Sequence, residues 1–114
     1  DDTQAKGNDG RAIGPTEVIV DLDLRVAFSS DASNQDKRNV QIEAEDTLRE
    51  YIINIDMGGK LFVSKIINLI FNTDSENIKD ATINSLFINN KETVIENKEL
   101  HWDERFIPNR INIE

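Results

Sequence analysis

The stretch NVQIEAEDTLREYIINIDMGGKLFVSKIINLIF, residues 39–71, decides how this chain folds. Its first part repeats apolar side chains at the three- and four-residue steps of one helical face; these are Val40, Ala44, Leu48, Tyr51, Ile52 and Ile55. Charged side chains take the opposite side, and Gly58-Gly59 interrupts the pattern. Because glycine adopts backbone conformations that other residues resist, we expect a long amphipathic helix ending near Asp56, then a break and a second, shorter helix.

Residues on either side of this stretch predict where the two helices begin. Ser33 or Asn34 is suited to cap the first helix, with Asp36 favourably placed in its first turn. Residues 60–63 are expected to be extended, and Ser64 is expected to cap the second helix. The buried face of the second helix should consist of Ile66, Ile67, Ile70 and Phe71.

Residues 17–29 give the clearest strand pattern in the chain. Apolar side chains occupy six successive even positions, namely Val18, Val20, Leu22, Leu24, Val26 and Phe28. This alternation predicts one buried face and one solvated face. Asp21 and Asp23 then share the outer face, which suggests either a paired-carboxylate site or a charged solvent face compensated by Arg25. The solvent face is the favoured interpretation.

Three later segments complete the predicted sheet. Residues 78–88 read as a strand, Asn89-Asn90 suits a tight turn into a returning arm at 93–95, and residues 106–113 read as a last strand. Pro108 favours an edge position for that last strand. We therefore expect an α+β fold, in which a three- to four-stranded antiparallel or mixed sheet has two helices packed on one face.

Length and composition set limits on the organisation and partners of the chain. Its 114 residues suit one domain, expected over residues 11–114, and the polar residues 1–10 are expected to form a flexible linker from a preceding domain of a longer polypeptide. A net charge of −9 disfavours direct binding to nucleic acid. No apolar run is long enough for membrane insertion, and the absence of cysteine excludes disulfides and thiolate metal sites.

No group of residues in the sequence converges on a recognisable reaction. His101, Asp103 and Glu104 are too close together along one segment to surround a metal, and no second His or Cys is present. Gly58-Gly59 lacks the Lys-Ser/Thr that follows a phosphate-binding loop, and residues 72–77 lack the order of an EF-hand. We therefore expect no catalytic residues, no cofactor, no metal and no enzymatic activity.

Binding to other proteins is the remaining function that the residues suggest. Aromatic side chains are enriched in protein interfaces, and exposed sheet edges with apolar side chains invite pairing. The candidate interface residues are Trp102, Phe106, Leu86, Ile88 and Ile95. The acidic balance of the chain would steer a basic partner, which suggests an adaptor module as one alternative.

The chain also resembles the C-terminal domain of the baseplate J-like family, across residues 11–114. Three segments carry the resemblance: RAIGPTEVIV at 11–20, LREYII with MGGKLFVSKII at 48–53 and 57–67, and DERFIPNRINI at 103–113. The family has a Val-rich strand, a helix, a Leu-Gly break, a Ser-capped second helix and a closing strand in this order. Its members form wedges of the baseplates of contractile-tail phages and related injection particles.

The resemblance implies a structural role in a virion. The domain would mediate contacts between subunits in the baseplate ring, with other baseplate subunits and through a homodimer or larger self-association. It would be located in the tail baseplate after assembly in the cytoplasm of a bacterial host. The alternative is an acidic protein-protein binding or adaptor module unrelated to phage tails.

Overall fold

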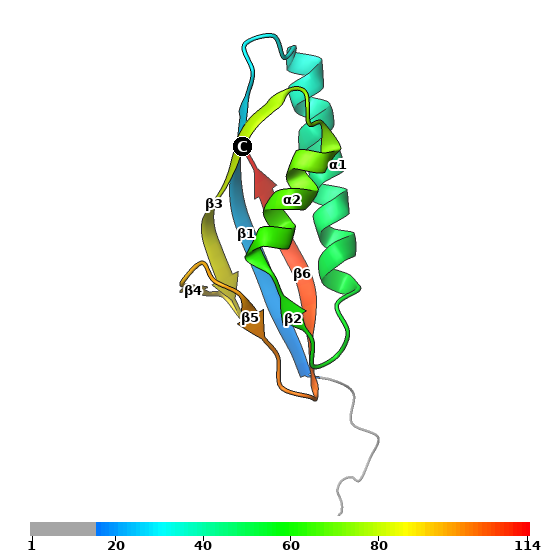
Figure 1. The fold of residues 1–114 in the computed structure, drawn as a ribbon. Coiled ribbons are helices and arrows are strands. Elements are labelled where there is room, and N and C mark those ends of the chain that lie inside the picture. Colours follow the sequence, from blue (N-terminus) through cyan, green and yellow to red (C-terminus); the bar gives the residue numbers. More distant parts are fainter. Residues whose placement is uncertain (1–15) are drawn as a thin grey trace, which may run out of the picture.

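The computed structural model describes residues 16–114, which form a sheet covered by two helices (Figure 1). The elements follow in the order β1 (Thr16–Phe28), α1 (Asn34–Ile53), β2 (Lys60–Leu61), α2 (Val63–Thr73), β3 (Ile78–Ile88), β4 (Lys91–Thr93), β5 (Lys98–Glu99) and β6 (Glu104–Ile113). The predicted α+β class is confirmed. The linker expected over residues 1–10 and the segment 11–15 lie outside the described residues.

Strand β1 occupies the centre of a four-stranded mixed sheet with the order β4-β3-β1-β6. It pairs antiparallel with β3 and parallel with β6. Strand β6 is therefore an edge strand, as Pro108 predicted, and that proline lies opposite Val20. Strands β2 and β5 form a separate two-stranded sheet. Both helices cover the same face of the larger sheet (Figure 1).

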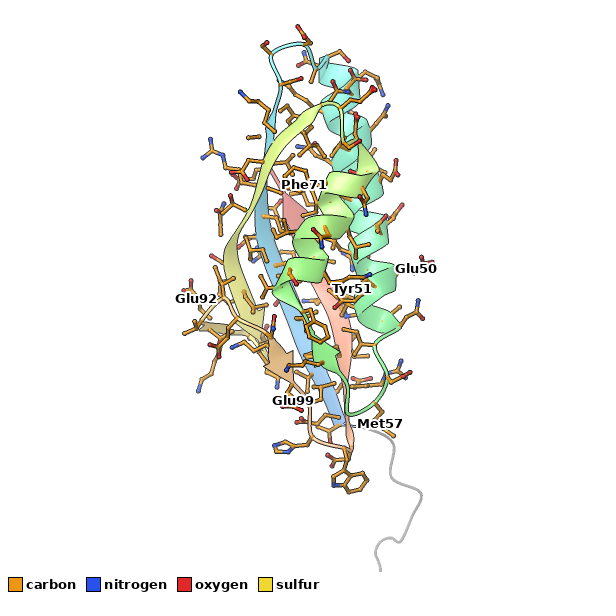
Figure 2. All side chains as sticks on the ribbon, in the orientation of Figure 1. Glu50, Tyr51, Met57, Phe71, Glu92 and Glu99 are labelled. Atoms are coloured by element: carbon orange, nitrogen blue, oxygen red, sulfur yellow. The ribbon has the colours of Figure 1, made fainter. Side chains whose placement is uncertain are left out.

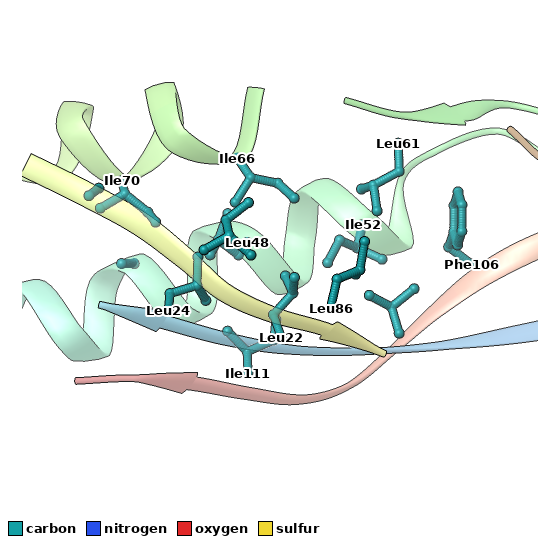
Figure 3. Packing of buried hydrophobic residues seen from close by; sticks show 14 of the residues in the cluster. Leu22, Leu24, Leu48, Ile52, Leu61, Ile66, Ile70, Leu86, Phe106 and Ile111 are labelled. Carbon is teal, nitrogen blue, oxygen red and sulfur yellow. The ribbon is translucent and has the colours of Figure 1, made fainter. Parts of the chain in front are cut away.

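The core lies between that sheet face and the two helices (Figure 3). From β1 it receives Val18, Val20, Leu22, Leu24 and Val26, and from α1 it receives Val40, Ala44, Leu48 and Ile52. From α2 it receives Ile66 and Ile70, whereas Tyr51, Ile55, Ile67 and Phe71 are partly buried against the cluster. The predicted helical faces are thus the faces that pack. Within residues 16–114, neither helix is long and apolar enough to cross a membrane.

Two register shifts explain why the apolar pattern of β3 is irregular. Asp23 pairs with Ser85 and Leu24 with Ile83, so Asn84 has no partner of its own in the ladder. A second shift lies between Ala27 and Phe28. Each extra residue reverses which parity of the strand faces the helices. Buried side chains consequently fall at Ile78, then at Ala81 and Ile83, and then at Leu86.

Strands β3 and β4 are joined by the tight turn that the Asn pair predicted. Asn89 and Asn90 have φ angles of 52° and 69°, the left-handed region that this two-residue hairpin requires. The Asn89 side chain also accepts a hydrogen bond from the Ile19 N–H at 2.9 Å. The turn is therefore tied to the central strand as well as to its own hairpin.

The start of α1 was predicted correctly, and its end lies slightly earlier than expected. Ser33 is the N-cap: its hydroxyl accepts from the Asp36 N–H at 3.0 Å, and the Asp36 carboxylate accepts from the Ser33 N–H at 3.1 Å. This is a capping box, which satisfies two backbone donors at once. The helix ends at Ile53 rather than near Asp56, because the chain turns before it reaches Gly58.

The predicted Ser64 cap of α2 is wrong. The helix begins at Val63 with Phe62 in the N-cap position, and no side chain of that residue caps it. The amide oxygen of Asn97 instead accepts from the Val63 N–H at 2.8 Å, and the Tyr51 hydroxyl accepts from the Phe62 N–H at 3.1 Å. Donors at the helix start are thus satisfied from remote segments, so Ser64 is not needed for this purpose.

Replacing Asn97 with alanine should destabilise α2. The change leaves the Val63 N–H without its acceptor, and loss of an N-terminal cap costs about 1 kcal/mol. Thermal unfolding of Asn97→Ala should therefore begin several degrees lower than in the wild-type chain. Asn97→Asp is the matched control, because it keeps an oxygen at the same position and should retain most of the stability. Equal losses in both variants would contradict a capping role.

The expectation that Asp21 and Asp23 form a solvent face compensated by Arg25 is wrong for Asp21. Asp21 is 7% exposed. Its Oδ1 accepts from the Arg110 N–H at 2.8 Å and from Asn109 Nδ2 at 3.0 Å. The register of β1 and β6 shifts between Val20 and Leu22, so the carboxylate satisfies the backbone where β6 bulges. Arg110, rather than Arg25, approaches Asp23, at 3.5 Å.

Candidate functional site

The five candidate interface residues separate into buried and exposed positions. Phe106 and Leu86 are each 1% exposed and belong to the core, so their expected exposure at a sheet edge is wrong. Ile88 is partly buried against the same core. Trp102 is 82% exposed and Ile95 is 40% exposed. Only these last two side chains are available to a partner in the folded domain.

Phe106 and Leu86 are buried because their side chains lie on the face of the sheet that the helices cover. Phe106 lies opposite Val18, so it shares the face of the sheet that the helices cover. An edge strand leaves its outer hydrogen-bonding groups free, yet one of its two faces is still part of the core. Leu86 faces the helices because the extra residue Asn84 reverses the side on which it would otherwise lie.

Other large apolar side chains are exposed that the sequence pattern did not indicate. They are Ile42, Ile53, Met57, Phe62 and Val94. Met57 lies in the loop that follows α1, at the end of the molecule opposite the α2–β3 connection (Figure 2). Phe62 and Val94 lie within segments 60–63 and 93–95, which were expected to be extended, but β2 ends at Leu61 and the returning strand β4 is Lys91–Thr93, so both residues lie outside the strands. Their solvent exposure depends on which strand or loop covers them, and sequence periodicity does not reveal that.

A groove of about 580 Å³ lies between the end of α1, strand β2 and the start of α2. We call it the α1–α2 groove; it is lined by Tyr51, Asn54, Ile55, Asp56, Gly59, Lys60, Phe62 and Lys65. Tyr51 points from α1 towards α2, and its hydroxyl holds the Phe62 backbone (Figure 2). Lys60 Nζ lies 5.6 Å from the centroid of the Phe62 ring, a cation–π distance. Aromatic and aliphatic walls with cationic groups beside them are suited to binding an amphipathic ligand.

The Gly58-Gly59 turn connects this groove to the β5–β6 turn. Gly58 has φ of 75°, and its N–H donates to the Glu104 carbonyl at 2.8 Å. A Cβ at Gly58 would lie 3.2 Å from the Cα of Trp102. At Gly59 it would lie 2.7 Å from the Asp56 carbonyl oxygen, so no larger residue fits without movement. Gly58 therefore permits close packing of the two turns, and Gly59 permits the tight turn itself. The sequence predicted the turn but not the packing.

The segment His101–Glu104 is a compact turn. The Glu104 carboxylate accepts from the His101 N–H at 2.8 Å, and the Glu104 N–H donates to the His101 carbonyl at 3.0 Å. The Glu104 carboxylate therefore binds the backbone of its own turn. Within residues 16–114, no three His, Cys, Asp or Glu side chains are grouped as metal ligands.

The backbone of the exposed Trp102 lies close to Gly58, and Gly59 lines the α1–α2 groove, so both adjoin one glycine turn. No protein-family model matches this chain, and no curated protein sequence matches it significantly.

Proposed function

We propose that this domain is a non-catalytic structural module that holds protein subunits together, and specifically a baseplate wedge subunit domain of a contractile phage tail or related injection particle. One observation carries the interaction role: Trp102 is 82% exposed, although a tryptophan in water leaves a large apolar area uncovered. It stands beside a groove with apolar walls. Both features are suited to contact with another protein.

The specific proposal of a baseplate wedge is supported by the family resemblance. The first resembling segment runs into β1, the second covers the end of α1, the glycine turn and the first part of α2, and the third coincides with β6. These segments contribute core residues from β1, α1, α2 and β6, whereas β3, which also supplies core residues, lies outside them. In a baseplate ring, such a domain would contact neighbouring subunits and move with them when the tail contracts.

Electron microscopy of purified contractile-tail particles from the source, labelled with an antibody against this domain, tests the proposal. We expect label at the distal end of the tail, near the baseplate ring. Disrupted baseplates serve as the control for epitopes that neighbouring subunits cover. Absence of label from both intact and disrupted particles would refute the wedge assignment.

An acidic adaptor module is the second candidate, and the surface of α1 favours it. Glu43, Asp46 and Glu50 are exposed on this helix. Such a surface would attract a basic partner and accelerate association. If the particles carry no label, pull-down experiments should compare the wild-type chain with a Glu43→Gln/Asp46→Asn/Glu50→Gln variant. A basic partner should bind the wild-type chain and not the variant, whereas nonspecific capture should be the same with both.

A further inference from the structure

We infer that the α1–α2 groove receives Trp102 of a second copy of this chain, and that two copies make this contact reciprocally. The inference rests on the proposed role as an interaction domain, and it identifies one partner and one contact. It does not require the domain to belong to a phage tail, because its basis is the surface of the folded chain.

The walls of the groove suit an aromatic side chain. Tyr51, Ile55 and Phe62 supply its apolar surface, and the groove volume of about 580 Å³ is ample for an indole ring. The chain does not fill this groove with its own tryptophan, since Trp102 is 82% exposed. An aromatic ring from another molecule would bury both surfaces and could stack on the Tyr51 and Phe62 rings.

The charges of the two surfaces are complementary. The groove carries Lys60 and Lys65 with only Asp56 of opposite sign, in a chain whose net charge is −9. Among residues 16–114, no ion pair involves either lysine. Trp102 is followed directly by Asp103 and Glu104. An acid-flanked aromatic ring that enters a lysine-flanked groove reduces the repulsion that two acidic chains would otherwise experience.

The tryptophan is presented by a turn whose backbone is already held in place. The hydrogen bonds between His101 and Glu104 close the turn, and the Gly58 N–H binds the Glu104 carbonyl at 2.8 Å. A preformed turn loses little conformational entropy when it binds. Because Trp102 and the groove adjoin the same glycine turn, two copies related by a two-fold axis can each donate one ring and accept one.

The size of the contact predicts a weak dimer. A tryptophan buries about 200 Å², and two insertions with the groove walls they cover give roughly 800 Å² in total. Stable interfaces bury about 1,200–2,000 Å², so we expect association only at high concentration, with a dissociation constant on the order of 100 μM or more. Where other contacts already hold two copies side by side, the raised effective concentration would make such a contact sufficient.

Self-association and the environment of the tryptophan should therefore change together. Trp102 is the only tryptophan of the chain, so its fluorescence reports this contact without interference. We would measure sedimentation velocity of the wild-type chain from about 10 μM to 1 mM, the range implied by the weak interface, together with emission and acrylamide quenching. The expected result is a monomer–dimer equilibrium in which the emission shifts to the blue and quenching falls as dimer forms. Trp102→Ala should weaken association at least tenfold.

Charge variants test the groove separately from the tryptophan. Lys60→Glu/Lys65→Glu should weaken association at least tenfold, whereas Lys79→Glu/Lys91→Glu, which changes the net charge equally at exposed sites on β3 and β4, should weaken it far less. Asp103→Lys alone should also prevent self-association. An equimolar mixture of Asp103→Lys with Lys60→Glu/Lys65→Glu should restore the dimer, because both reciprocal contacts then join opposite charges. Melting curves confirm that each variant is folded.

Three results would overturn the inference. The first is a wild-type chain that stays monomeric at the highest concentration, with Trp102 as accessible to acrylamide as it is at the lowest concentration. The second is a dimer that survives Trp102→Ala, and the third is a dimer that the two lysine double variants affect equally. In each case the groove would belong to a different partner or to none. The baseplate proposal would still depend on the labelling experiment, so the two can fail independently.

Discussion

Replacing Leu48 with aspartate should unfold the domain. Leu48 is 0% exposed on the face of α1 that covers the sheet, among Leu22, Leu24 and Ile66 (Figure 3). A carboxylate there has no cation to pair with, and burying an unpaired charge costs several kcal/mol in addition to the lost apolar contacts. Small domains have only about 5–15 kcal/mol of stability in total. Circular dichroism should show loss of the cooperative thermal transition.

Ile42→Asp is the matched control for this experiment. Ile42 is on the same helix but exposed, so the same change there should alter stability by about 1 kcal/mol or less. Leu48→Ala should fall between the two, with a loss of about 2–5 kcal/mol. A cooperative melt of Leu48→Asp near the wild-type temperature would show that this helix face is not in the core.

Replacing Asp21 with alanine should cost about 2–4 kcal/mol, the second largest effect expected. The change removes the acceptor of the Arg110 N–H and of the Asn109 side chain; Asp21 is buried, whereas Asn109 and Arg110 are exposed. Hydrogen bonds to a charged group contribute about 1.5–3 kcal/mol, and loss of two such bonds accounts for the expected effect. Chemical denaturation should show a lower midpoint with an unchanged dependence on denaturant, as expected for a loss of stability alone.

Asp23→Ala provides the comparison for Asp21→Ala. Asp23 is more exposed and makes one ion pair with Arg110 at 3.5 Å, so its loss should cost less than about 1 kcal/mol. Asp21→Asn should be intermediate, because the amide keeps one acceptor oxygen without the charge. Equal effects of Asp21→Ala and Asp23→Ala would mean that the β6 bulge does not depend on the carboxylate.

Local patterns in the sequence were sufficient to predict the fold class. The alternation in β1 and the helical period in α1 each arise from neighbouring residues that face one core, so both could be recognised within a short window. The capping box at Ser33 and Asp36 and the turn at Asn89-Asn90 are local for the same reason. The sheet order is not local, yet the edge position of β6 could be inferred from Pro108.

The predictions that failed depend on contacts between remote residues. The Asn97 side chain that caps α2 is 34 positions away from Val63, and the acceptor that binds the Arg110 N–H is 89 positions away. Leu86 was expected to be exposed, but the unpaired residue Asn84 changes the face of the sheet on which the following side chains lie. A bulge of this kind has no unique sequence pattern. The groove depends on how α1, β2 and α2 meet, and only the folded chain shows this.

The position of β1 between β3 and β6 has a consequence for biosynthesis. Its partners on both sides are made much later, since β3 begins at Ile78 and β6 at Glu104. During translation β1 therefore emerges as a strand with six regularly spaced apolar side chains and two vacant edges, a state prone to aggregation. Contacts so distant along the chain also slow folding. Chains that stop before β6 should therefore stay prone to aggregation until the last strand has been made.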